Sequence, residues 1–332
     1  MELRKRGKIE EKLFGLAAYE AIGGVGSVVI PDLIIPDFYK IVPTAQIPES
    51  GIIFSRIPVS SVTPQRLTNL KTGQSAVLSH CEKMGDRFAV LDSPRGAETG
   101  KGTNRIEEWP DNFQLAPYSK FGALYYPWLR EKAADFGGRD LLIPPSGHVA
   151  GVYARVETRE SVARAPAGEP LAGVVEFEFC LNDSAQAVLN PKGVNCLRSF
   201  PGRGLLVWGA RTLSLDPLWR YVNVRRLCLA IIKQILINLQ WTVFEPNDAT
   251  LWQKIVATLT IFLNDLFRRG ALAGAKPQEA FFVKCDAETN PPDVVDAGQV
   301  ITEIGFAPAR PAEFVYVTIK RTTESVSVQE RS

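Results

Sequence analysis

The sequence predicts a mixed α/β fold, and three observations lead to this prediction. Short apolar runs that end at proline, such as residues 27–36, are typical of buried strands. Stretches with apolar residues at helical spacing lie between such runs, and the two strongest are residues 223–239 and 247–270. Three β-rich segments then close the sequence. The combination indicates sheets packed against helices and argues against an all-α or an all-β chain.

Composition limits the classes of partner. The 332 residues, 45% hydrophobic and 22% charged, suffice for one large domain or two ordinary ones. With 38 basic and 36 acidic residues the formal net charge is +2, so no strong overall field favours nucleic acid or an anionic membrane. The longest apolar stretch contains Lys233 and is too short to cross a bilayer. We therefore expect a soluble protein without nucleic-acid binding or direct membrane insertion.

The cysteines indicate a reducing compartment. They are odd in number, widely spaced and without a CxxC pair, which argues against a disulfide framework or a zinc ribbon. We expect a cytoplasmic setting. The five are Cys81, Cys180, Cys196, Cys228 and Cys285.

The N-terminal part reads as alternating helices and strands. The expected helices are residues 11–23 and 73–84, and the expected strands are residues 27–36, 87–94 and 121–130. Residues 40–72 contain four prolines and no clear period, and residues 95–112 are polar and contain glycine, so both read as irregular. Residues 144–157 read as a loop that leads into a helix, with Ser146 as its cap.

The character of the chain changes after the loop at residues 165–173, and we place a soft boundary near Gly173. The helix at 247–270 has Asn247 or Asp248 as its cap and Gly270 at its exit. Residues 241–246, WTVFEP, read as a short strand between the two long helices. The closing β-segments are residues 280–286, 299–308 and 312–322.

One motif imitates a phosphate-binding loop. Residues 96–103, GAETGKGT, follow a predicted strand, as such a loop would. A Walker loop needs four residues between its glycines and a Ser or Thr after the lysine, because that hydroxyl binds Mg²⁺. Here three residues intervene and Gly102 follows Lys101, and Pro110 comes too early for a long phosphate-binding helix. A surface loop is the favoured interpretation, and a nucleotide-binding enzyme remains the alternative.

No other catalytic or metal constellation is present in the sequence. His80 and His148 have no metal-ligand spacing, and each is interpreted as a structural hydrogen-bonding residue, with general base as the alternative. The sequence GGVGS at 23–27 precedes a strand, so it reads as a helix exit and not as a dinucleotide turn. We therefore expect no catalytic residue, no metal and no cofactor.

The other candidate phosphate-binding site is the stretch 200–214, FPGRGLLVWGARTLS, which contains glycines and arginines. No helix starts directly after its glycines, so it lacks the amide groups that would hold a phosphate. It is interpreted as a turn, a core strand and another turn. Its structural motif consists of Arg203, Trp208, Arg211 and Asp216, with Asp216 as a candidate ion partner of the arginines.

The specific motifs in residues 193–323, and their order, are more informative than the spacing of the apolar residues in this segment. The segments GVNCLRSFPGRGLLVWGARTLSLDPLWRYVNVRRL, WTVFEPNDATLWQKI, FLNDLFRRGALAGAKPQEAFFVKCDAETNPP and DAGQVITEIGFAPARPAEFVYVTI occur in this order. Together they resemble the C-terminal part of the contractile tail sheath family, the sheath subunits of contractile phage tails and of bacterial contractile injection systems. The resemblance continues upstream in LSHCEKMGDRFAVLDSP and PPSGHVAGVYARVE and covers about four fifths of the chain.

The resemblance implies a mixed α+β protomer with a central mixed sheet flanked by helices. It implies stacked hexameric rings around an inner tube, which contract without nucleotide and drive the tube through a target envelope. The implied partners are further copies of the chain, the inner tube protein, and baseplate and cap or terminator proteins. A baseplate- or cap-proximal sheath-like protein at one end of the particle is the alternative within this class.

The resemblance also implies two contact regions. A C-terminal arm, residues 309–332, is expected to donate a strand to a sheet of a neighbouring subunit, with an ordinary intramolecular edge strand as the alternative. The residues of that strand are Glu313, Phe314, Val315, Tyr316, Val317, Thr318 and Ile319. A basic helix is expected to face the tube through Lys254, Arg268 and Arg269, with dipole capping of a solvated helix end as the alternative.

One departure from the family pattern concerns the N-terminus. Members usually begin with an extended arm, often with a PGVYVEE-like motif, whereas residues 1–22 here read as a charged helix. We expect either a specialised subunit at one end of the sleeve or a link through a different N-terminal element. The expected core comprises an N-terminal part at 23–172 and a C-terminal part at 173–308.

Overall fold

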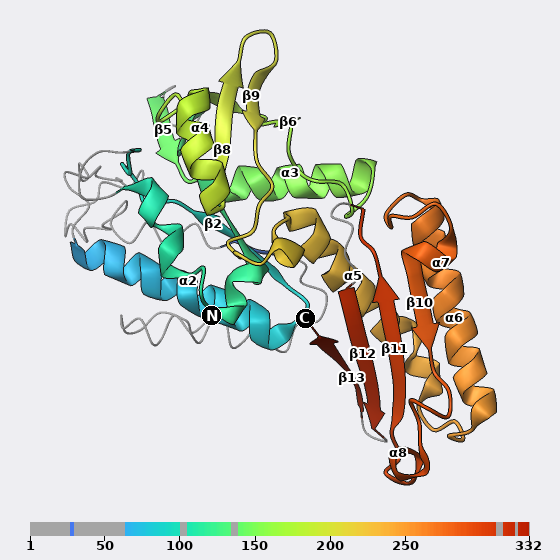
Figure 1. The fold of residues 1–332 in the computed structure, drawn as a ribbon. Coiled ribbons are helices and arrows are strands. Elements are labelled where there is room, and N and C mark those ends of the chain that lie inside the picture. Colours follow the sequence, from blue (N-terminus) through green and yellow to red (C-terminus); the bar gives the residue numbers. More distant parts are fainter. Residues whose placement is uncertain are drawn as a thin grey trace, which may run out of the picture. The chain divides into compact units, whose positions relative to one another are not determined.

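The computed structural model describes residues 27–29, 64–99, 105–133, 139–309, 315–322 and 325–331 (Figure 1). The chain forms two compact units. Unit 1 comprises Met1–Arg155 and Pro166–Leu215, and unit 2 comprises Val156–Ala165 and Asp216–Ser332. The expected boundary near Gly173 falls within unit 1. The expected helix at 11–23 and the irregular residues 40–63 lie outside the described residues.

Unit 1 is built on a six-stranded mixed sheet, which confirms the predicted fold class. The sheet order is β1 (Ser27–Val29), β2 (Phe88–Asp92), β3 (Gly122–Tyr126), β8 (Val194–Phe200), β9 (Gly204–Val207) and β6 (Glu169–Pro170). The first four strands are parallel, and β9 and β6 are each antiparallel to their neighbour. All five residues of β2 and of β3 are buried, as expected for parallel strands covered on both faces.

The helix predicted at 73–84 is confirmed as part of α2 (Pro64–Met84). It starts nine residues earlier than predicted, so the irregular interpretation of residues 64–72 was wrong. Pro64 is the first helical residue, a position where proline is tolerated because its missing N–H has no intrahelical partner there. Leu70, Val77 and Leu78 are among its buried residues.

The predicted strand at 121–130 is two strands in two sheets. β3 ends at Tyr126, and β4 (Leu129–Ala133) pairs instead with β5 (Arg139–Ile143) and β7 (Val174–Phe177) in an antiparallel sheet. Pro127 lies between the two strands, where a residue without an N–H cannot extend a ladder.

The described part of the loop predicted at 95–112 contains more helical structure than expected. It contains two short 3₁₀ helices, η3 (Ile106–Glu108) and η4 (Pro110–Asn112), and a third, η5 (Pro117–Phe121), follows it. Buried Ile106 and Trp109 anchor this segment, so apolar contacts override its polar composition.

The helix predicted after the loop at 144–157 is confirmed as α3 (Ser146–Arg159). Ser146 is its first residue but was wrongly expected to provide the capping acceptor. Its backbone N–H donates to Asp92 Oδ1 at 2.7 Å, and its Oγ donates to Asp92 Oδ2 at 2.5 Å. The carboxyl group at the end of β2 therefore accepts the hydrogen bonds of the first residue of α3. The remaining short helices of unit 1 are α4 (Asp183–Leu189) and η7 (Asn190–Lys192).

Unit 2 places two long helices against an antiparallel sheet. The sheet order is β10 (Phe281–Lys284), β11 (Val300–Phe306), β12 (Val315–Thr322) and β13 (Ser325–Arg331). The first three strands confirm the predicted β-segments, and β13 was not predicted. The helices are η8 (Pro217–Trp219), α5 (Val222–Asn238), η9 (Gln240–Thr242), α6 (Ala249–Arg268), α7 (Pro277–Ala280) and α8 (Pro292–Asp296).

Both long helices match the prediction, and the segment between them does not. Asp248 is the N-cap of α6, accepting from Leu251 N at 2.9 Å, and Gly270 follows the helix with a φ of 72°. Residues 241–246 are not a strand. Thr242 Oγ1 instead donates to Leu239 O at 2.8 Å and closes the η9 turn.

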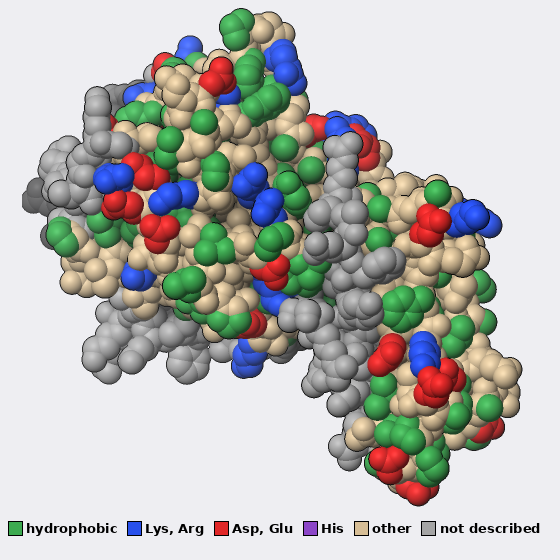
Figure 2. Space-filling view, in the orientation of Figure 1, with side chains coloured by type: hydrophobic (Ala, Val, Ile, Leu, Met, Phe, Trp, Pro, Cys, Tyr) green, Lys and Arg blue, Asp and Glu red, His purple; other side chains and the backbone are tan. Residues whose placement is uncertain are grey.

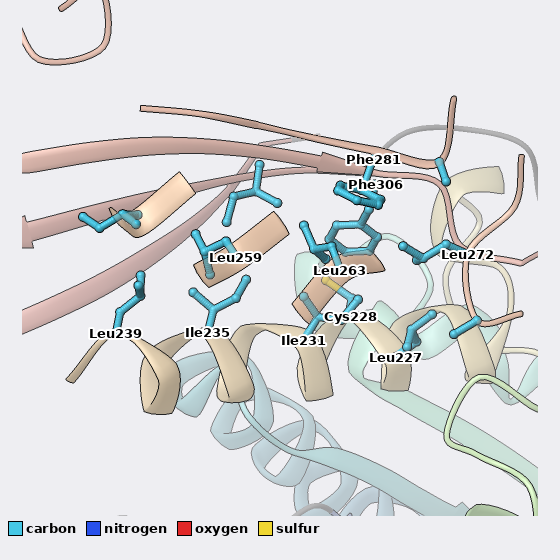
Figure 3. Packing of buried hydrophobic residues seen from close by; sticks show 14 of the residues in the cluster. Leu227, Cys228, Ile231, Ile235, Leu239, Leu259, Leu263, Leu272, Phe281 and Phe306 are labelled. Atoms are coloured by element: carbon cyan, nitrogen blue, oxygen red, sulfur yellow. The ribbon is translucent and has the colours of Figure 1, made fainter. Parts of the chain in front are cut away.

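The core of unit 2 is a single apolar cluster between the helices and the sheet (Figure 3). Helix α5 contributes Leu227, Cys228 and Ile231, and α6 contributes Leu259 and Leu263. Phe281 and Phe306 from the sheet point into the same cluster. Residues on one face of each helix therefore join the helices to the sheet.

Candidate assembly surfaces

The backbone pairing of β12 is the first candidate contact. In the single chain, β12 pairs with β11 in a register of seven residue pairs, from Val300 opposite Arg321 to Phe306 opposite Val315. β13 covers its other edge. Val315–Ile319 of the expected donated strand lie in β12, and Glu313 and Phe314 lie outside the described residues.

The chain that follows β11 is held by the unit 2 core. Ala307 N donates to Ala280 O and Ala309 N donates to Ala271 O, at 2.8 and 2.9 Å. Five residues, 310–314, then connect Ala309 to the start of β12. The strand is therefore joined to a fixed point by a short link, and its pairing with β11 consists of backbone hydrogen bonds that any copy of the strand can make.

The solvent face of α6 is the second candidate contact. Lys254 and Arg268 are exposed, and they lie 14 residues apart, so they fall on one side of the helix about four turns from each other. Arg269 is also exposed and pairs with Asp265 at 2.9 Å. Ile261, 73% exposed, lies halfway between Lys254 and Arg268. The predicted basic residues thus share a face with an apolar residue and one carboxylate.

The residues of the glycine- and arginine-bearing stretch form a stacked cluster on the β8–β9 hairpin. The rings of Phe200 and Trp208 lie 4.5 Å apart, and Arg203 Cζ lies 5.7 and 5.2 Å from their centroids. Arg203 is exposed at the turn, Trp208 is half-buried, and Arg198 stacks on Phe200 from the strand at 4.8 Å. The arginines therefore stabilise the hairpin through cation–π contacts.

The other two residues of that predicted motif lie outside the hairpin. Arg211 is held through its main chain, whose N–H donates to Asn195 Oδ1 at 2.6 Å and whose carbonyl accepts from Asn195 Nδ2 at 2.7 Å. Asp216 accepts from Leu218 N at 2.8 Å and caps η8. Neither contact has the form of a phosphate site.

The described part of the phosphate-like loop lacks the geometry for phosphate binding. The next helical element is η3, whose three residues include Glu107 and Glu108, so negative charge stands where a phosphate would need amide groups. Residues 100–104, with Lys101, lie outside the described residues. The groups of histidine, cysteine and carboxylate side chains in the described part of the chain include none with the arrangement of a metal site.

The buried titratable groups serve the fold. Arg87, fully buried, donates to His80 Nε2 at 3.0 Å and to Asp86 Oδ1 at 2.9 Å, so His80 is a hydrogen-bonded core residue. Burial raises the pKa of the Cys81 and Cys196 thiols to about 12, which makes both poor nucleophiles at neutral pH. Burial also raises the pKa of Asp92 to about 7.

Two family models match adjacent parts of the chain. The phage tail sheath protein central domain matches residues 63–213, and the phage tail sheath C-terminal domain matches residues 214–322. A chain in the anti-feeding prophage baseplate in its contracted state is 34% identical, and the alignment covers 74% of this chain and 67% of that chain with a TM-score of 0.63. The chain belongs to the phage tail sheath family.

Other sheath proteins support the assignment. A chain in the contracted sheath complex of the extracellular contractile injection system PVC is 36% identical to this chain. The alignment covers 72% of this chain and 66% of that chain, with a TM-score of 0.63. The tail sheath protein of Burkholderia phage BcepMu is 29% identical over 192 residues, which are 55% of this chain and 39% of that protein. The chain spans less than half the length of the curated tail sheath proteins that it matches.

The boundary between the two family models lies close to the main boundary between the two units. The two family models meet between residues 213 and 214, and unit 1 ends at Leu215. The tail sheath family is a family of structural proteins and not of enzymes. Among the described helices, none combines the length and apolar character needed to span a membrane.

Proposed function

We propose that this protein is a sheath subunit that polymerises as stacked hexameric rings around an inner tube and contracts to drive the tube through a target envelope. The observation that carries the proposal is its 36% identity to a sheath complex in the contracted state, across 72% of the chain. Contraction needs no nucleotide, because a lattice assembled in a metastable form releases free energy when its contacts rearrange. The particle assembles in the cytoplasm, and its further partners are baseplate and cap or terminator proteins.

In the assembled sleeve, β12 of one copy pairs with β11 of a neighbouring copy. The seven-residue register supports this exchange, because the same backbone groups make the same hydrogen bonds within a chain or between chains. Exchange of an identical element between protomers costs little when the paired surfaces are unchanged. It links the subunits mechanically while their bodies move.

A cysteine pair across these strands distinguishes exchange from self-pairing. Glu303 and Thr318 lie directly opposite each other on β11 and β12, within disulfide reach. In a Cys180→Ser background, the variant Glu303→Cys/Thr318→Cys is oxidised as assembled sleeves and as single copies. Exchange predicts covalent multimers from sleeves on a denaturing gel, and disulfides within one chain from single copies.

The control uses the same position on β11. Lys284 lies opposite Glu303 on β10, on the other side of β11, so Lys284→Cys/Glu303→Cys joins two strands of one body. This pair should give monomers in both states. Monomers from sleeves of the β11–β12 pair as well would show that β12 stays in its own chain and would refute the exchange.

The solvent face of α6 contacts the inner tube through Lys254, Arg268 and Arg269. Exposed cations at the C-terminal end of a helix suit an acidic tube surface. Arg268→Glu/Arg269→Glu should reduce recovery of the tube protein in a pull-down at low salt. Arg164→Glu is the control, because Arg164 is also exposed and pairs with a carboxylate four residues away. Equal recovery by all three proteins would refute the contact.

A sheath-like subunit confined to one end of the particle is the second candidate. It is favoured by the matches to chains in two anti-feeding prophage baseplate structures, 35% and 34% identical. Gold labelling of the protein in whole particles separates the two roles, since a sleeve subunit is labelled along the full length and an end subunit at one tip.

A further inference from the structure

The turn after η9 holds a phenylalanine in a backbone conformation that phenylalanine disfavours. Glu245 N donates to Thr242 O at 3.3 Å, which closes a four-residue turn. Its central residues are Val243, with φ −66° and ψ 128°, and Phe244, with φ 71°. These angles are typical of a type II turn, whose third position favours glycine or asparagine. Within the described part of the chain, Phe244 is the one non-glycine residue with positive φ.

The isolated chain gains no packing from this side chain. Phe244 is 92% exposed, so its ring stabilises neither unit 2 nor the turn. Trp241, three residues earlier, and Ile237, one helical turn before Trp241, are also exposed large apolar residues. Strained backbone and a solvated aromatic side chain together indicate selection for a contact outside the chain.

Acidic residues lie on the segments that are connected to this turn by hydrogen bonds. Asn247 Nδ2 donates to Gln299 O at 3.0 Å, and Gln299 N donates to Val294 O at 3.0 Å, so the turn is tied to the α8 end of the sheet. Helix α8 carries exposed Asp293 and Asp296, and Glu245 follows Phe244 directly. Figure 2 shows acidic side chains grouped at this end of unit 2.

We propose that the Phe244 turn is a plug that inserts into an apolar, basic-rimmed surface of a second copy of this chain. This inference rests on the proposed function, because a sleeve repeats the same contact at every subunit. Charge complementarity with an exposed arginine on the chain itself supports a second copy as the partner of this acidic projection. The β8–β9 turn is one apolar surface with a basic rim, because exposed Arg203 lies beside the rings of Phe200 and Trp208.

The substitution Phe244→Gly separates a contact role from a folding role. Glycine adopts positive φ without strain, so the thermal midpoint of the single-copy variant should equal or exceed that of the wild type. The protein concentration needed to form sleeves should rise at least about tenfold, as for truncation of a buried aromatic anchor. Phe244→Asn, which also tolerates this turn position, should behave in the same way.

The control is Leu115→Ala, which truncates another nearly fully exposed apolar residue. It should leave the concentration for sleeve formation unchanged. Sleeve formation by Phe244→Gly at the wild-type concentration would overturn the plug, and so would a lowered thermal midpoint with normal sleeves, because the ring would then serve the fold.

Photo-crosslinking identifies the protein that contacts the Phe244 turn, and it does so independently of sleeve formation. The variant Phe244→p-benzoylphenylalanine should yield a covalent dimer of this chain at high protein concentration, with the joined peptides read by mass spectrometry. Uncrosslinked monomer, or an adduct with the inner tube protein alone in whole particles, would overturn the inference. A wild-type protein that forms no sleeves but gives the dimer would refute the proposed function and retain the plug.

Discussion

Substitution of Asp92 by asparagine should remove a large part of the pH dependence of unit 1 stability. Asp92 ends β2, is 3% exposed, and accepts the N–H and the hydroxyl of Ser146. Burial outweighs these two hydrogen bonds and raises its pKa from 3.8 to about 7. The native carboxyl therefore keeps its proton at pH values where the unfolded chain has lost it.

The sign of the effect follows from this proton. Well below pH 3.8 both states are protonated, and the stabilising contribution of the raised pKa is fully present. As the pH rises from 4 to 7, ionisation of Asp92 lowers the free energy of the unfolded state, whereas the native carboxyl stays protonated until about pH 7. The span from 3.8 to about 7 corresponds to a loss of about 4 kcal/mol of unfolding free energy.

Asparagine is neutral throughout this range and keeps an oxygen to accept Ser146 N–H, while its amide can donate to Ser146 Oγ. Urea unfolding of single copies at pH 4.5, 5.5, 6.5 and 7.5 measures the effect. The difference between Asp92→Asn and wild type should move in favour of the variant by roughly 1.4 kcal/mol per pH unit. Asp293→Asn, an exposed carboxylate on α8, should follow the wild type. Parallel curves for wild type and Asp92→Asn would refute the reasoning.

Two predictions concern the helices of unit 2. Asp248→Ala removes the side-chain acceptor of Leu251 N and should lower the unfolding free energy by about 1 kcal/mol, measured by urea titration followed by circular dichroism; an unchanged midpoint would argue against the cap. Leu259→Ala opens a cavity at a fully buried position and should cost about 3 kcal/mol, whereas Ile261→Ala on the exposed face of the same helix should change stability by less than about 0.5 kcal/mol. Equal losses for these two variants would contradict the assigned orientation of α6.

The sequence was informative where local chemistry decides the structure. The apolar spacing of α6, its Asp248 cap and the glycine at its exit all act within one helix, so the helix was predicted with its ends. The strands β2, β10 and β11 were also predicted from local pattern, because a short continuous apolar run between turn residues is typical of a buried strand.

The errors arose where distant residues or an unusual local backbone conformation decide the structure. Ser146 looks like a cap in sequence, but its acceptor, Asp92, lies 54 residues earlier on β2. WTVFEP has the composition of a strand, but Thr242 closes a turn against Leu239, and Phe244 takes a positive φ that no propensity predicts. The polar segment Ser325–Arg331 becomes β13 because β12 offers it a free edge, which a single-strand pattern cannot reveal.

The candidate site depended more on resemblance than on residue chemistry. The tail sheath family was identified from long ordered motifs, and the family models and solved sheath structures confirm it. Backbone pairing carries no side-chain signature, so the exchange of β12 stays a prediction. The Phe244 turn was missed because an exposed aromatic residue in a turn has the same sequence pattern as a buried one in a strand.

Electron microscopy of the full-length protein produced together with its inner tube protein tests the central claim most directly. The account predicts hollow sleeves of sixfold rings along the whole tube, in a long narrow form and a short wide form, with β11–β12 density that passes between neighbouring copies in both. Bare tubes that carry this protein only at one tip, or sleeves in which every β12 pairs within its own chain, would contradict it.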